Sequence, residues 1–152
     1  MSFKDWRQRL EIALAGQAPS FEQWQSLHRL AMVSEFAIDV LVQQPEIIPD
    51  LDNPSSPLSL PEGRESDWPK LIRHWRRAQS VKLIWRDVTG LDSVEQTLAG
   101  STWIAEQALT AGFDAILASM KKVHGTVRCA QGSEQFMVIL GLGKLGGGEL
   151  NF

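Results

Sequence analysis

The sequence predicts a mainly α-helical protein that ends in the first strand and the glycine-rich loop of an incomplete α+β domain. Over most of the first 122 residues, apolar side chains recur at steps of three and four, which is the spacing of one helix face. The pattern then changes to a continuous apolar run, residues 136–140. Five glycines follow within the eight residues 141–148. The two patterns together indicate a helical region joined to the start of a different kind of domain.

The composition is that of a soluble globular protein. Of the 152 residues, 43% are hydrophobic and 22% are charged, which is enough apolar material for one core. The net charge of -3 provides no broad attraction for nucleic acid or for an anionic membrane, so we expect neither as a partner. The chain has no apolar run of membrane-spanning length and no secretory signal pattern near its start. We therefore expect a cytoplasmic protein, which the single cysteine, Cys129, also suits.

Residues 1–51 are expected to form an N-terminal helical segment. A first, weak helix is predicted from Phe3 to Ala15. Ser20 and Gln23 have the spacing of a capping box, in which each side chain bonds a free amide at the start of a helix. Ser34 is placed to cap a further helical segment.

A loop and a helical pair are expected next. Residues 52–65 contain three prolines, a glycine and three serines, which favours an irregular loop. Residues 66–122 then carry two amphipathic patterns separated by Gly90, and we expect two antiparallel helices. Ser66 is predicted to cap the first of them, and Ser93 the second.

The glycine-rich stretch after the predicted strand is typical of a phosphate site. Glycine allows the backbone to approach a ligand closely and leaves amides free for phosphate oxygens. A P-loop is excluded, because Val138 stands where its first glycine belongs and Leu145 where its serine or threonine belongs. The dinucleotide fingerprint G-x-G-x-x-G is matched by Gly141, Gly143 and Gly146, but its helix start and its distant acidic residue are not found.

A third interpretation rests on a longer match. Residues 139–152, read as ILGLGKLGGGELNF, resemble the segment of glutamine synthetase adenylyltransferases that runs from a strand through Gly-Lys-Leu-Gly-Gly to Glu-Leu-Asn. Fourteen consecutive positions agree in kind. Residues 71–77 and 84–91 are similar to the family's arginine-rich helix, which ends in Arg-Asp and a glycine, and Ser34, Phe36 and Pro45 also match. The resemblance covers the chain from about Phe21.

This resemblance implies a function for the end of the chain. Members of the family carry two nucleotidyltransferase domains of the polymerase-β type, one that removes AMP from glutamine synthetase by phosphorolysis and one that attaches it from ATP. Residues 135–152 resemble the start of the first, adenylyl-removing domain. In that setting Lys144, Gly146 and Gly147 are expected to bind the nucleotide and phosphate.

The resemblance also implies what the chain lacks. The family's Asp-x-Asp pair, which holds magnesium, would begin two residues beyond Phe152, so no catalytic residue and no metal ligand is assigned here. We expect the chain alone to be inactive, and its unpaired strand to cause self-association. The implied partners are glutamine synthetase, a nitrogen-regulatory signalling protein, ATP or ADP, and phosphate. Two alternatives stay open: a non-enzymatic helical interaction module, and the start of a dinucleotide-binding domain.

Other polar and aromatic groups favour structural roles. Asp50 and Asp52 have Asp-x-Asp spacing but lie between prolines, ahead of the glycines, and we interpret them as loop acids. The three histidines lack the spacing of metal ligands. The six tryptophans are expected in the core, not as base-stacking platforms. A basic group is expected to form a solvated helix face with local ion pairs; it comprises Arg73, Arg76, Arg77, Lys82 and Arg86.

Overall fold

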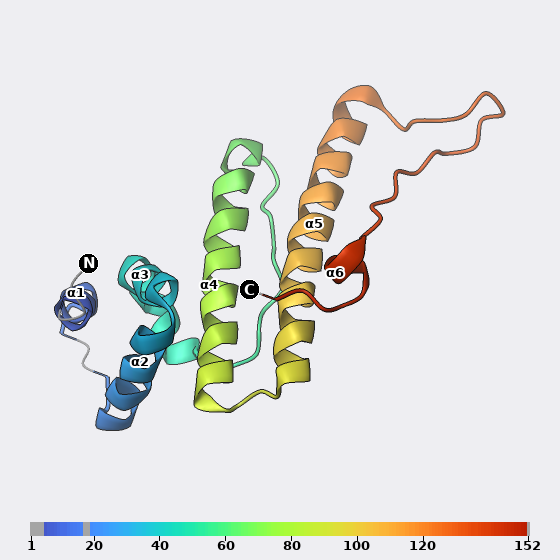
Figure 1. The fold of residues 1–152 in the computed structure, drawn as a ribbon. Coiled ribbons are helices and arrows are strands. Elements are labelled where there is room, and N and C mark those ends of the chain that lie inside the picture. The colour runs from blue at the N-terminus through green and yellow to red at the C-terminus, as the bar shows by residue number, and fades with distance from the viewer. Residues whose placement is uncertain (1–4, 17–18, 152) are drawn as a thin grey trace.

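The computed structural model describes residues 5–16 and 19–151, and this part of the chain is mainly α-helical, as predicted (Figure 1). The helices are α1 (Trp6–Ala13), α2 (Phe21–Val33), α3 (Glu35–Gln43), α4 (Trp68–Thr89), α5 (Val94–His124) and the short α6 (Gly143–Gly146). Two 3₁₀ turns are η1 (Pro45–Asp50) and η2 (Glu65–Asp67). The predicted start of the first helix at Phe3 lies outside the described residues.

Local capping signals set the helix ends. The capping box of Ser20 and Gln23 opens α2, and the Ser34 hydroxyl accepts the Ala37 amide at the start of α3. Ser93 opens α5 with a second capping box. Gly90 ends α4 in the left-handed conformation with φ 75°, which costs a glycine little. All of these predicted ends are confirmed.

The start of α4 differs from the prediction. Ser66 lies within the 3₁₀ turn η2, and Asp67 occupies the N-cap position with helical dihedral angles and no side-chain cap bond. The Asp67 carboxylate instead accepts two hydrogen bonds from the Arg64 guanidinium, at 2.7 and 2.9 Å. The prediction that Ser66 caps the helix is therefore wrong, because the chain already turns helically before α4 begins.

Helix α4 lies between the N-terminal helices and α5. On one side, α1, α2, α3 and η1 enclose a core with the second half of α4, whereas α5 runs antiparallel to α4 on the other side (Figure 1). The predicted antiparallel pair is confirmed. The shared core consists of Leu10, Leu27, Leu30, Ala37, Ile38, Val40, Leu41, Ile48, Leu51, Val81, Ile84 and Trp85. Residues before and after the proline-rich loop thus contribute to one core, although the domain boundaries proposed from the sequence stay a prediction.

The proline-rich loop is irregular but fixed along α4. We call residues 51–64 the strap. Three indole N–H groups of α4 donate to it: Trp68 to the Pro61 carbonyl at 2.8 Å, Trp75 to the Ser56 carbonyl at 2.9 Å, and Trp85 to the Asp52 carboxylate at 2.7 Å. The strap therefore follows the helix in the opposite direction and covers it. Tryptophan here supplies both apolar area and the donors that satisfy the loop.

The predicted strand is not formed. Among the described residues there is no strand, and the C-terminal region contains a single isolated bridge, between Arg128 and Glu134. The apolar side chains of residues 136–140 are between 49% and 79% exposed. The prediction of a buried strand is wrong for this chain, because the described residues contain no second strand with which the run could pair and its side chains are exposed.

Candidate functional site

The glycine-rich end folds into a tight turn built around α6. Gly143 and Gly148 take positive φ values of 59° and 71°, a conformation that side chains disfavour. A Cβ atom at Gly146 would collide with the carbonyl oxygen of Gly141. Close approach of two backbone segments thus requires glycine at position 146.

Backbone bonds close this turn on itself. The Gly147 amide donates to the Gly143 carbonyl at 2.9 Å, and the Glu149 amide to the Lys144 carbonyl at 2.8 Å. The exposed Lys144 ammonium donates to the Asn151 side-chain oxygen at 3.3 Å. The three predicted phosphate-binding residues are thus brought together in one turn. To bind phosphate, the Gly147 amide would have to release the Gly143 carbonyl. The assignment of Lys144, Gly146 and Gly147 as phosphate-binding residues stays a prediction.

The end of the chain is anchored on α5. The Leu150 amide donates to the Thr102 hydroxyl at 3.2 Å, and Thr102 is 6% exposed in the first third of that helix. Figure 1 shows the chain returning from a long excursion after α5 to lie against it at this point. The helical region therefore positions the glycine-rich turn through a contact 48 residues apart in sequence.

Asp50 and Asp52 each accept a hydrogen bond from a side chain of α4. The buried Lys82 ammonium donates to Asp50 at 2.7 Å, and the Trp85 indole donates to Asp52. Hydrogen bonds from Lys82 and then Asn53 hold the pKa of Asp50 below its ordinary value. Across the described residues no group of three or more His, Cys, Asp or Glu side chains is arranged to hold a metal ion.

The prediction that the basic group forms one solvated helix face is wrong for Lys82. Lys82 is 2% exposed and points inward, and Arg86 pairs with Asp92 at 2.6 Å, which raises the pKa of Arg86. Arg73 and Arg77 lie in the first half of α4, where they line a pocket together with Lys70 and His74. Lys70 and His74 were not predicted to belong to this group, although the spacing 70, 73, 74 and 77 places all four residues on one helix face.

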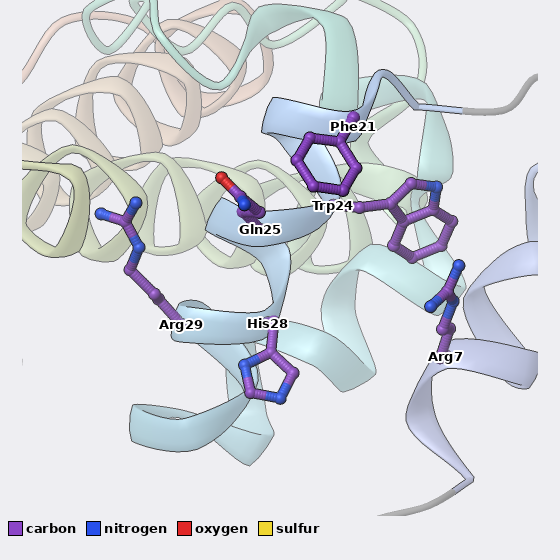
Figure 2. Close-up of a pocket in the computed structure, with 6 residues that line it drawn as sticks. All are labelled: Arg7, Phe21, Trp24, Gln25, His28 and Arg29. Atoms are coloured by element: carbon purple, nitrogen blue, oxygen red, sulfur yellow. The ribbon is translucent and has the colours of Figure 1, made fainter.

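The hollow between α1 and α2 is a packing feature (Figure 2). Its volume is about 520 Å³, and the Arg7 guanidinium lies 4.7 Å from the ring centre of Trp24. Trp6 packs against Trp24 and His28, each at 6.2 Å between ring centres. The six lining side chains include no thiol, hydroxyl or carboxylate; they are Arg7, Phe21, Trp24, Gln25, His28 and Arg29. The tryptophans here join α1 to α2, which agrees with their predicted structural role.

The described chain is thus a mainly helical region that positions a glycine-rich turn, and comparison with known proteins identifies its family. The family model described as "Glutamate-ammonia ligase adenylyltransferase" matches residues 24–152. The chain belongs to this family of nucleotidyltransferases.

Curated relatives agree with the family model. The chain is 49% identical over 130 residues to the "Bifunctional glutamine synthetase adenylyltransferase/adenylyl-removing enzyme" of Stenotrophomonas maltophilia strain R551-3, covering 83% of this chain and 14% of the relative. It is 45% identical over 150 residues to the protein of that name from Xanthomonas axonopodis pv. citri, covering 96% and 16%. For Shewanella woodyi the identity is 33% over 144 residues, covering 86% and 15%.

The chain spans about one sixth or less of the length of these three relatives. No solved structure matches it. In the part of the chain that the structure describes, every helix is too short or too polar to cross a membrane.

Proposed function

We propose that this chain is part of an enzyme that attaches AMP to glutamine synthetase and removes it, and that it belongs to the N-terminal, adenylyl-removing half. In the removal reaction, phosphate oxygen bonds to the adenylyl phosphorus while the bond to the tyrosine oxygen breaks, which yields ADP and the free tyrosine. The observation that carries the proposal is the family match over residues 24–152, which includes the glycine-rich turn. Glutamine synthetase is named as the substrate protein in the relatives' own names.

Within that enzyme the chain would supply phosphate contacts. Lys144 is exposed and carries its charge beside the turn, while Gly146 permits the close backbone approach that a phosphate group also needs. ATP or ADP and phosphate would be the small-molecule partners, and a nitrogen-regulatory signalling protein the regulatory one. We infer that these partners are met in the cytoplasm.

Magnesium would be held elsewhere in the enzyme. The described residues do not fit a magnesium site, because Asp50 and Asp52 are bound to Lys82 and Trp85 and no other suitable group is found among them. We therefore propose that the metal ligands, an Asp-x-Asp pair, come from outside these 152 residues, and that the chain by itself is inactive.

Two measurements test the proposal. Adenylylated glutamine synthetase, phosphate and magnesium are incubated with the isolated chain and with a full-length relative, and ADP is measured. We expect ADP from the full-length enzyme alone; ADP from the isolated chain would refute its inactivity.

In the full-length relative, Lys144→Met at the matching position should slow ADP formation at least about tenfold, as the loss of a charge that stabilises phosphate does. The matched control is Lys122→Met, which removes an exposed lysine at the end of α5, far along the chain from the turn. Equal rates for the two variants would argue against a phosphate-binding role for Lys144.

The rival function is a non-enzymatic helical interaction module. Because the family match extends through residue 152 and includes the turn, it favours the enzyme. The same match covers Gly141, Gly143 and Gly146, the three glycines of the dinucleotide fingerprint, and so favours the enzyme family over the start of a dinucleotide-binding domain.

A further inference from the structure

A basic pocket lies where the end of α3 meets the first half of α4. Its volume is about 260 Å³. It is lined by Gln43, Gln44, Lys70, Arg73, His74 and Arg77. It is separate from the glycine-rich turn, which rests on α5, and the proposed adenylyl transfer does not use it.

The pocket concentrates positive charge on one face of α4. Lys70, Arg73 and Arg77 lie three or four residues apart, so their side chains leave the helix on the same side. Within the described chain none of the three forms an ion pair, whereas Lys82 and Arg86 of the same helix do. The Glu46 carboxylate lies 3.7 Å from Nε2 of His74, at the edge of the group. Neighbouring cations repel one another unless an anion lies between them, so this face favours a negatively charged ligand.

Gln44 adds a second and independent observation. Its side chain is 3% exposed and lines the pocket, and its Nε2 donates weakly to the His74 carbonyl at 3.5 Å. Its Oε1 is buried and has no hydrogen-bond partner among the described residues. Buried polar atoms are almost always paired, so this oxygen is free to accept one more hydrogen bond.

The two observations together define the ligand. The largely exposed cations favour an anion, and a hydrogen-bond donor on the same molecule would satisfy the Gln44 oxygen. A carboxylate or sulfate ion is a pure acceptor at neutral pH, whereas hydrogen phosphate carries both charge and an O–H group. Guanidinium groups also match the paired oxygens of phosphate.

We propose that this pocket binds a small phosphorylated anion. Lys70, Arg73 and Arg77 neutralise its charge, and the Gln44 Oε1 accepts a hydrogen bond from a protonated phosphate oxygen or from a hydroxyl group of the ligand. The volume suits a diphosphate or a compact phosphate ester. Free phosphate and the phosphate of a larger metabolite share this chemistry.

The first test compares two arginines of α4. Pyrophosphate binding to the 152-residue chain is measured by calorimetry at low salt for Arg77→Gln and for Arg76→Gln. Both variants lose one positive charge from the same helix, but Arg76 does not line the pocket. We expect Arg77→Gln to weaken binding about tenfold, as loss of a charge-assisted hydrogen bond does, and Arg76→Gln to change it less than about twofold. No measurable binding by the unaltered chain, or equal weakening in both variants, would overturn the site.

The second test addresses the donor. The unaltered chain should bind inorganic phosphate more tightly than sulfate, because sulfate has no proton to give to Gln44. The variant Gln44→Met keeps the side-chain length and removes the acceptor, so the preference should disappear while its circular dichroism stays unchanged. Equal affinity for the two ions in the unaltered chain would contradict the role of Gln44, and this comparison holds even if the variant does not fold. ADP as a ligand separates the two sources, because a metabolite site should bind it more tightly than phosphate.

Discussion

Val81→Ala tests the finding that residues on both sides of the strap share one core. Val81 is fully buried on α4, within the cluster that also contains residues of α1, α2 and α3. The substitution removes two methyl groups, a transfer cost of about 1.6 kcal/mol at about 0.8 kcal/mol each. Incomplete collapse of the cavity adds about 1 kcal/mol. We therefore expect the free energy of unfolding to fall by about 2.5 kcal/mol.

The assay is urea unfolding, followed by tryptophan fluorescence and by far-ultraviolet circular dichroism. Tryptophans in α2, α4 and α5 report on both sides of the strap. The control is Val94→Ala, the same chemical change at the start of α5, where the side chain is 68% exposed. It should change the free energy of unfolding by less than about 0.5 kcal/mol.

Two results would refute the shared core. One is a loss for Val81→Ala no larger than that for Val94→Ala. The other is a wild-type transition in two separate steps, of which the substitution moves only one, since a single core unfolds cooperatively. Either result would mean that the α1–α3 region and the α4–α5 pair are independent units joined by a loop.

Three further predictions concern local features. Ser93→Ala should lower the free energy of unfolding by about 1 kcal/mol through loss of the capping box, whereas Ser66→Ala, outside any cap, should leave it within about 0.3 kcal/mol in the same urea assay. Because the pKa of Asp50 is lowered in the folded state, its bond to Lys82 stabilises the protein above about pH 4 and is lost as the pH falls through that lowered pKa. Asp50→Asn should therefore reduce stability at pH 7 and weaken the pH dependence of stability below about pH 4. Thermal melts at a series of acidic pH values that show the same pH dependence for the variant and the unaltered chain would contradict this. Gly146→Ala should shift the backbone amide resonances of residues 141–149, because a Cβ atom there meets the Gly141 carbonyl oxygen, and an unshifted spectrum would show that this turn is not populated in solution.

The helices follow from neighbouring residues, and the sequence predicts them well. Each confirmed boundary depends on contacts within four positions: the capping boxes at Ser20 and Ser93, the hydroxyl of Ser34, and the left-handed glycine at Gly90. Ser66 shows the limit of such signals, because a preceding 3₁₀ turn and the bond between Arg64 and Asp67 displace the expected cap.

Residues far apart in sequence decide the rest. The run at residues 136–140 has the composition of a buried strand, but pairing and burial depend on a neighbouring backbone that the sequence pattern does not specify. The strap likewise reads as a loop, yet indole donors on α4 hold it in place.

By itself, the sequence determined that the protein is mainly helical, where most helices begin and end, and which family its glycine-rich end resembles. All of these depend on short-range patterns of residue type. Only the tertiary structure decided which charges are paired. In the folded chain, Lys82 pairs with Asp50 and Arg86 pairs with Asp92. Lys70, Arg73 and Arg77 form no ion pair among the described residues and line the same pocket as Gln44, whose side-chain oxygen has no partner there. The physical reason is that the spacing of charges along a helix is local, whereas the groups that meet them come from other elements.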